Sequence, residues 1–323
     1  MKLLAGPVRR RLALRVATGG AVLAVLSFLV FVGVDLLPGD PVTARLGPNA
    51  TPERVAEIKA ARGLDEPVLT RYAHWLGGLL HGDLGTSASG KPVSGMLADR
   101  IGNSVLLAGL CVLLLVPVSL AAGLYAARRP GRAADRTVSA GSLMLVSVPE
   151  FVVASGLVLL FAVGLGALPA VSLIPAGDSP LQHPRMLVMP VLSLLLVAAA
   201  YAIRVIRACA VTVLAGPQVE FLRLTGVRER TILRTAVVPA VLPVAVQVWL
   251  VTGVGLVGGA VLVEKVYGYP GIGELLVSAV LGGDLPVVQA LVIVLGAAML
   301  LALVVADLAV VLLTPRLRTG GAG

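Results

Sequence analysis

The segment from Gly85 to Pro92 contains the residue types of a phosphate-binding loop at almost the right spacing. It reads Gly-Thr-Ser-Ala-Ser-Gly-Lys-Pro, whereas the nucleotide-binding pattern is Gly-x-x-x-x-Gly-Lys followed by Ser or Thr. Pro92 therefore stands where a hydroxyl group would bind Mg²⁺, and proline lacks the N–H group that a helix beginning there would offer. No strand is predicted before the segment. We expect no nucleotide site here and no cofactor bound by this chain.

Other reactive side chains are few and widely separated. The chain has two cysteines, Cys111 and Cys209, and three histidines. His74 and His81 could share one helix face, but no third ligand lies near them in sequence, so we interpret both as surface residues. No nucleophile can be paired with a base. These counts argue against a metal cluster, a disulfide framework and a membrane-embedded hydrolase.

Glu150 is the ionisable residue with the most unusual surroundings. It interrupts the otherwise uncharged run Thr137–Gly177, which we interpret as one helix near 138–166, with two short spans as the alternative. At about 1.5 Å per residue, Glu150 would then lie near the middle of a bilayer. An ionisable residue at that depth is by default a candidate functional site, here in the transport pathway, and a protonated or hydrogen-bonded structural glutamate is the competing interpretation. Asp307, in the last apolar run, could pair with a basic residue near one membrane face.

The composition identifies the elements that would have to position these residues. Of 323 residues, 58% are apolar and 13% are charged, and the mean hydropathy is +0.98. A soluble domain has about 45–50% apolar and about 25% charged residues, so soluble enzymes and disordered tails are excluded. A membrane-spanning helix needs roughly 20 apolar residues. Six runs qualify: Val16–Val34, Ile101–Ala127, Thr137–Gly177, Met186–Ile203, Thr235–Val263 and Leu285–Ala306.

Lysine and arginine are distributed unevenly between the segments that join these runs. Segments 1–15, 128–136, 204–234 and 315–323 hold 17 of them against three acids, and the other connecting segments hold 9 against 12 acids. Positive charge stays on the cytoplasmic side of a membrane protein. We therefore expect both termini in the cytoplasm. The basic pI then reflects topology, and no nucleic-acid partner is expected.

The outer loop, about 39–100, is predicted to contain two helices. Thr51, Pro52 and Glu53 form an N-cap, a proline at the first helical position and an early acid, which predicts a helix through Ala61. A second helix is predicted over Glu66–Leu80. Its apolar stripe fits a membrane surface or a partner protein. Before these helices, the sequence Pro38-Gly39-Asp40-Pro41 is expected to end the first span.

The inner loop between the fourth and fifth runs is predicted to form a helix–turn–helix. Gly216-Pro217 opens a short helix, Gly226 follows it, and a second helix is expected from about Arg228 to Val238. Gly226 occupies a position that favours a left-handed backbone, which glycine adopts without a Cβ clash. Two interpretations stay open at this point. The segment is either a basic helix on anionic lipid or a docking element for another protein.

Nearly the whole chain resembles the inner-membrane permease subunits of bacterial ABC importers for dipeptides, oligopeptides and nickel chelates. The matching motifs occur in the family's order. They are Leu36-Leu37-Pro38-Gly39-Asp40-Pro41, Gly63-Leu64-Asp65-Glu66-Pro67, Gly82-Asp83-Leu84-Gly85-Thr86-Ser87, Val263-Glu264-Lys265-Val266-Tyr267, Pro270-Gly271-Ile272-Gly273, Asp284-Leu285-Pro286-Val287-Val288-Gln289 and Pro315-Arg316-Leu317-Arg318. Thr314 stands where the last motif usually has aspartate.

The resemblance implies an all-α permease of six transmembrane helices with the type I ABC-importer fold, forming one domain over 1–323. Its cytoplasmic coupling segment, about 209–238, would dock into a groove of an ATPase. The family motif Glu-Ala-Ala-x-x-x-Gly maps onto Glu220 to Gly226, with Phe221 and Leu222 in place of the alanines. The residues assigned to coupling are Glu220, Arg223, Gly226, Arg230 and Pro243.

The resemblance also implies the partners of this chain. They are a second homologous permease, two cytoplasmic ATPase subunits that use ATP and Mg²⁺, an extracytoplasmic substrate-binding protein, and the lipid of the bacterial inner membrane. The chain itself would be non-catalytic. Its cargo would be a peptide or a related small solute, a nickel chelate included. The alternative function is a secondary transporter or channel that couples to an ion through Glu150.

Overall fold

The computed structural model describes residues 6–35, 51–61, 65–175 and 177–313. In these ranges the regular elements are helices, apart from one isolated antiparallel bridge between Thr86 and Pro92. The residues group into two compact units. Of the described residues, the first unit comprises 6–16, 101–175, 177–274 and 298–313, and the second comprises 17–35, 51–61, 65–100 and 275–297.

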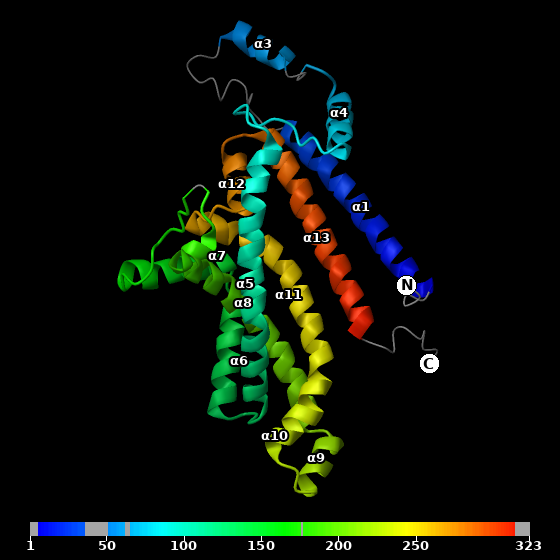
Figure 1. Ribbon diagram of the computed structural model, residues 1–323, viewed down its shortest axis with the longest axis vertical. Coiled ribbons are helices and arrows are strands. Elements are labelled where there is room, and N and C mark those ends of the chain that lie inside the picture. Colours follow the sequence, from blue (N-terminus) through cyan, green and yellow to red (C-terminus); the bar gives the residue numbers. More distant parts are fainter. Residues whose placement is uncertain (1–5, 36–50, 62–64, 176, 314–323) are drawn as a thin grey trace. The chain divides into compact units, whose positions relative to one another are not determined.

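Figure 1 shows the helices in chain order. They are α1 (Gly6–Asp35), α3 (Pro52–Ala61), α4 (Val68–Leu80), α5 (Val93–Ala127), α6 (Ala133–Val146), α7 (Glu150–Leu157), the π-helix η2 (Val158–Gly164), the 3-10 helix η3 (Pro180–Gln182), α8 (Pro184–Leu214), α9 (Pro217–Leu224), α10 (Glu229–Ile232), the π-helix η4 (Leu233–Val237), α11 (Val238–Tyr267), α12 (Ile272–Leu281) and α13 (Leu285–Leu313).

Five helical stretches are long and apolar enough to cross a membrane. They are Ala13–Gly33, Val93–Ala127, Pro184–Leu214, Glu229–Tyr267 and Leu285–Ala309. A sixth is obtained if the bent pair Ala133–Val146 and Glu150–Gly164 is one span. The chain is thus an all-α polytopic membrane protein, as its charge-poor runs predict.

The prediction that the third span is one continuous helix is wrong. The span is not one helix near 138–166, because α6 ends at Val146 and α7 begins at Glu150 with a bend of 107°. Pro149 explains the break: it has no N–H group to continue the helix, and it pushes the preceding Val148 out of helical conformation. Glu150 therefore lies in the first turn of α7 and not in the interior of a straight span.

The core of the first unit is built around α8, which contacts α6, α7 and α11. Small buried residues on α8, among them Ala198 and Ala202, let the neighbouring helices approach closely. Gly123 of α5 serves the same purpose, since a Cβ atom there would lie 2.7 Å from the Ile206 side chain. Trp249 of α11 donates from Nε1 to Ser119 Oγ of α5 at 2.8 Å.

In the second unit, α4 packs on α1 through aromatic side chains. The Tyr72 ring lies 5.2 Å from Phe28 and 5.4 Å from Phe31, both edge to face. The Tyr72 hydroxyl also lies 2.7 Å from Ser27 Oγ. Such pairs add to the stabilisation that apolar burial provides. The apolar stripe of α4 is therefore partly satisfied within this chain.

The predicted outer-loop helices are confirmed. Thr51 Oγ1 accepts the N–H of Arg54 at 3.3 Å, which is the expected N-cap of α3. α4 begins at Val68, directly after Pro67 and two residues later than predicted. The expected end of the first span at Pro38–Pro41 lies outside the described residues, as does Gly63 of the motif that follows α3.

Candidate coupling and transport site

The helix α9 is amphipathic, with one face anchored and the other exposed. Val219 is buried in a cluster with Ile206, Ile232 and neighbouring apolar residues, and Leu222 packs against the same cluster. On the opposite face, Phe221 is 65% exposed and Leu224 is 81% exposed. Large apolar side chains exposed on an anchored helix are typical of a surface that another protein covers.

Gly226 adopts the predicted left-handed conformation, with φ of +78°. It directly follows the C-terminal turn of α9, where the N–H groups of Gly226 and Val227 donate to Arg223 and Leu222 carbonyl oxygens, each at 3.0 Å. These bonds satisfy carbonyl groups that the helix end leaves free. No atom lies within 4 Å of a Cβ built at Gly226, so backbone conformation alone makes glycine favourable there.

The structure corrects the second helix of this loop. It does not end at Val238, because α10, η4 and α11 follow one another without a break. The segment is therefore continuous with a membrane span, and Pro243 lies inside that span. A π-helix inside a helical run is typical of functional sites.

The charged coupling residues lie on the exposed surface of α9 and α10. Glu220 and Arg230 are exposed. Arg223 Nε donates to Glu229 Oε1 at 2.7 Å, which joins α9 to α10 across the Gly226 turn. The five residues that sequence resemblance grouped together thus divide: four lie on or between the two short helices, and Pro243 does not.

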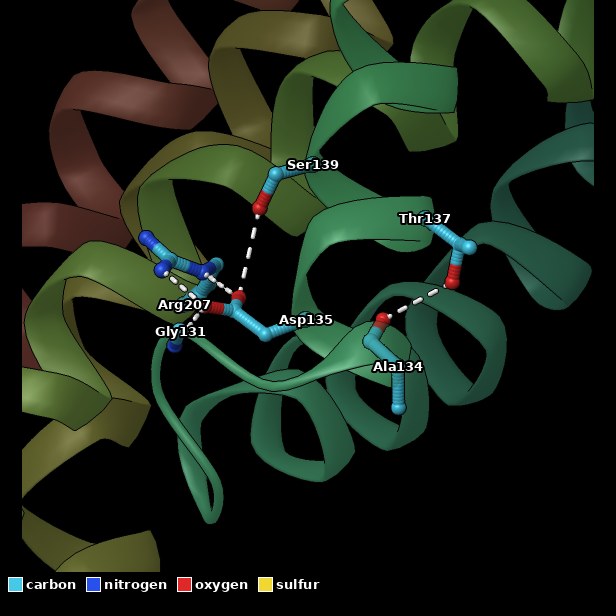
Figure 2. Close-up of polar contacts among 6 residues, drawn as sticks. All are labelled: Gly131, Ala134, Asp135, Thr137, Ser139 and Arg207. Carbon is cyan, nitrogen blue, oxygen red and sulfur yellow. Dashed lines mark hydrogen bonds and ion pairs between the residues drawn. The ribbon is translucent and has the colours of Figure 1, made fainter.

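A buried ion pair fastens α6 to α8 near this segment. Figure 2 shows Asp135 of α6 bound by the guanidinium of Arg207 of α8 and by the N–H of Gly131. Arg207 Nη2 lies 2.7 Å from Asp135 Oδ2, and Gly131 N lies 2.8 Å from the same oxygen. The Asp135 side chain is 4% exposed and that of Arg207 is 27% exposed. A bidentate pair of this kind fixes both the distance and the rotation of two helices.

Glu150 lies half-buried beside the glycine-rich face of α11. A Cβ atom at Gly259 would approach its Oε1 atom to 3.4 Å. Gly259 therefore lies near a neighbouring helix, whereas a Cβ atom at Gly255 would meet nothing within 4 Å.

A second glutamate, Glu264 of α11, is fully buried and accepts several hydrogen bonds. Ser104 Oγ of α5 donates to its Oε1 atom at 2.6 Å, and the N–H of Gly273 donates to Oε2 at 2.7 Å. A Cβ atom at Gly271 would overlap the same carboxylate, and one at Gly273 would overlap the backbone of Val261. These two glycines of the Pro-Gly-Ile-Gly motif therefore make room for Glu264.

Residues 268–271 are held by the same part of α5. Gly268 ends α11 in a left-handed conformation, with φ of +59°. Asn103 Nδ2 donates to the Pro270 carbonyl oxygen at 2.9 Å, and the Tyr269 hydroxyl donates to the Asn103 carbonyl oxygen at 2.8 Å. Burial raises the pKa of the Tyr269 phenol, and the negative charge of Glu264 raises it further. The phenol therefore stays protonated and remains a donor.

In the second unit, the segment that resembles a phosphate loop forms a tight turn around a carboxylate of this chain. Ala88 N donates to Asp284 Oδ1 at 2.9 Å, and Ser87 Oγ donates to Asp284 Oδ2. Ser87 is buried, and its N–H donates to the Lys91 carbonyl oxygen at 2.9 Å. The turn thus binds a carboxylate of this chain.

The remaining predicted residues lie apart from these groups. Asp307 of α13 pairs with Arg15 of α1, with Arg15 Nε 3.1 Å from Asp307 Oδ2, as its position near a basic membrane face predicts. His74 and His81 are exposed, as predicted. Among the described residues, no three metal-binding side chains lie together.

Sequence reasoning missed Ser104, Glu264 and the pair of Asp135 with Arg207. Glu264 belongs to a motif that gives it no role by itself, although an acid followed by closely spaced glycines could have signalled a buried carboxylate. Asp135 and Arg207 entered only as loop charges. No local pattern links them, because 72 positions separate them.

Two family profiles match the chain. The profile described as "Binding-protein-dependent transport system inner membrane component" matches residues 119–319. The profile of the N-terminal part of such membrane components matches residues 8–102.

Individual relatives are similar over almost their full length. A Brucella abortus protein named as a permease of a peptide transport system is 36% identical over 308 residues, which is 94% of this chain and 97% of the relative. A Sinorhizobium fredii protein named as a peptide ABC transporter permease is 30% identical over 302 residues, 92% of this chain and 96% of the relative. The glutathione transport system permease protein of Escherichia coli is 33% identical over 298 residues, which is 92% of this chain and 94% of the relative.

Proposed function

Because this chain belongs to the family of binding-protein-dependent transport system inner membrane components, we propose that it forms half of the pathway of an ABC importer and is driven by cytoplasmic ATPase subunits. The observation that carries the coupling role is the anchored helix α9, which exposes Phe221 and Leu224. Two large apolar side chains exposed on a helix whose opposite face is buried suit a groove of an ATPase.

The coupling segment acts by carrying ATPase movement into the membrane. α9 enters the ATPase groove, and Glu220 and Arg230 bind polar groups at its rim. Gly226 sets the angle between α9 and α10, and the ion pair of Arg223 with Glu229 holds that angle. Since α10 continues into α11, a displacement of α9 moves this span directly. Pro243 lies within the span, where a proline permits a local bend.

The complex would contain a second homologous permease, two ATPase subunits that bind ATP and Mg²⁺, and an extracytoplasmic substrate-binding protein. The loop of residues 39–100 and the segment 264–284 would receive the binding protein, and lipid of the inner membrane would surround the spans. The cargo would be a peptide or a glutathione-like compound, in line with the names of the relatives. A nickel chelate is the alternative cargo that the sequence resemblance implies.

Reconstitution tests the proposed function. We expect proteoliposomes with both permeases and both ATPases to hydrolyse ATP faster when the loaded binding protein is added, and to take up its ligand. This chain alone should neither hydrolyse ATP nor transport. Proton-driven uptake by this chain alone would instead identify a secondary transporter, with Glu150 as the ion-coupling residue.

Topology gives an independent prediction. Reporter fusions after Arg136 and after Arg318 should be cytoplasmic, and fusions near Lys91 and Asp178 should be external. The reason is the excess of lysine and arginine in one set of connecting segments. Alkaline phosphatase and green fluorescent protein fusions measure the two sides. An external C-terminus would contradict an even number of spans.

Glu150 is proposed to line the pathway, where its carboxylate meets the cargo. Glu150→Gln keeps the shape and removes only the charge, so it should lower uptake severalfold while leaving the amount of assembled complex unchanged. A structural glutamate would behave differently: Gln would be nearly silent, and Glu150→Ala would reduce subunit abundance through a lost buried interaction. Uptake per assembled complex separates the two roles. Wild-type uptake and abundance in both variants would exclude both of them.

A further inference from the structure

The first turn of α12 is capped by side chains from two other helices. Its N–H groups are among those that helical hydrogen bonding leaves free. Ile272 N donates to Ser104 Oγ at 2.9 Å, and Gly273 N and Glu274 N donate to Glu264 Oε2 at 2.7 and 3.3 Å. Three consecutive N–H groups of α12 are thus bound by α5 and α11 together.

The two capping side chains also depend on each other. The Ser104 hydroxyl has one proton, and it donates this proton to Glu264 Oε1 at 2.6 Å. Its oxygen is therefore free to accept the N–H of Ile272. Glu264 is fully buried, so water cannot replace any bond that it loses. Hydrogen bonds to a buried carboxylate are stronger than those between neutral groups, and leaving such a group unpaired is costly.

We propose that Glu264 is a positioning residue of the transport cycle: with Ser104 it holds the first turn of α12 only while α5 and α11 keep their present separation. This proposal rests on the proposed function, in which the segment beginning at Glu264 receives the binding protein. Docking of that protein on the 264–284 segment then acts on α5 and α11 together, because this segment begins on α11 and is bound by Asn103 and Ser104 of α5. A shift of α11 along α5 releases the N–H groups of α12, because hydrogen bonds weaken steeply with small changes in distance and angle.

The same contacts indicate which part of the cap stays with α5 and which part leaves with α11 when the cap is released. Separating α5 from α11 breaks the bond between Ser104 and Glu264, which joins the two capping side chains directly. The turn of residues 268–271 stays tied to α5 through Asn103. Glu264 then leaves with α11, and the first turn of α12 loses the two hydrogen bonds that Glu264 Oε2 accepts. In the proposed cycle the cap therefore alternates between this engaged arrangement and a released one.

Two variants and a matched control test this role in the assembled complex. Glu264→Gln keeps the shape, but its NH₂ group cannot accept the bonds that a carboxylate oxygen accepts. Ser104→Ala removes the hydroxyl that joins α5 to the cap. Ser193→Ala is the control, because it also deletes a buried hydroxyl beside the last turn of α11, one that lies 2.9 Å from the Tyr267 hydroxyl and outside the cap.

Amide hydrogen exchange at residues 272–274 and ATPase stimulation by the loaded binding protein are the measurements. We expect both Glu264→Gln and Ser104→Ala to speed exchange at these amides at least tenfold and to lower the stimulation severalfold per assembled complex. The double variant should be no worse than the stronger single variant, since one network is lost. Ser193→Ala should leave exchange at 272–274 unchanged.

The outcomes are distinct. Faster exchange with unchanged stimulation would show that the cap only holds the fold, and unchanged exchange would show that the cap is absent; either result overturns the proposal. Equal effects of Ser193→Ala and Ser104→Ala on both measurements would also overturn it, because any lost buried hydroxyl would then suffice. A wild-type complex without stimulation would instead refute the proposed function itself, and with it this role of Glu264.

Discussion

Replacing Gly226 with valine should uncouple ATP hydrolysis from uptake while leaving membrane insertion normal. A β-branched residue with φ near +78° is strained by about 1–2 kcal/mol. The turn can escape this strain by changing the angle between α9 and α10, which misplaces Phe221 and Leu224. If docking has to restore the strained angle, the affinity of the ATPase falls about tenfold. Co-purification of the ATPase and uptake by intact cells measure the effect.

Gly131 provides a matched control for this prediction. It has the same φ of +78° and equally open space where a Cβ atom would lie, but it belongs to the turn between α5 and α6. Gly131→Val should therefore retain the ATPase in amounts that follow subunit abundance. Glu220→Lys, which changes charge without backbone strain, should release the ATPase as Gly226→Val does. Normal uptake and pull-down in both coupling variants would return the segment to a basic helix on lipid.

Removing the carboxylate of Asp135 should have the largest effect on stability. Asp135→Ala leaves Arg207 and the Gly131 N–H without their acceptor. Breaking a fully buried pair costs about 3–5 kcal/mol, and because Arg207 is about a quarter exposed we expect about 2–3 kcal/mol. Subunit abundance in the membrane should fall severalfold. Quantitative immunoblotting and thermal unfolding of the purified subunit in detergent measure this loss.

Two further variants show whether the pair itself is responsible. Asp135→Leu combined with Arg207→Met should recover most of the lost stability, because an apolar pair of similar size removes both uncompensated groups. Arg136→Ala deletes an exposed arginine next to Asp135 and should change stability by less than about 0.5 kcal/mol. If the double variant were as unstable as Asp135→Ala, the helices would depend on the charges in some other way.

Local sequence signals predicted the elements that depend on neighbouring residues. The N-cap at Thr51 and the left-handed turn at Gly226 are set within a few positions, so the pattern and the structure agree. The break before Glu150 also has a local signal, because Pro149 cannot continue a helix. The length of the uncharged run around it favours a straight third span, and that signal is the misleading one.

Long-range polar contacts could not be predicted in this way. Ser104 and Glu264 are 160 positions apart, and Ser87 and Asp284 are 197 apart. Each pair forms because packing brings two helices or a loop and a helix together, and serine is too common in sequences to identify its partner. The family resemblance placed both acids in motifs. It did not indicate that Glu264 accepts the N–H groups of the first turn of α12, or that Asp284 binds the turn at Ser87 and Ala88.

Because α10, η4 and α11 follow one another without a break, a rotation at one end of this helical stretch is transmitted to the other end. The stretch covers 39 residues, from Glu229 to Tyr267, which at about 1.5 Å per residue is about 58 Å. About one degree of tilt at the α9 end therefore displaces the Glu264 end by about 1 Å, enough to strain a 2.6 Å hydrogen bond. The π-helical turn at Leu233–Val237 is the place where this stretch would flex and lose part of the displacement. In the proposed coupling mechanism, stiffening that turn should therefore increase the displacement that reaches Glu264.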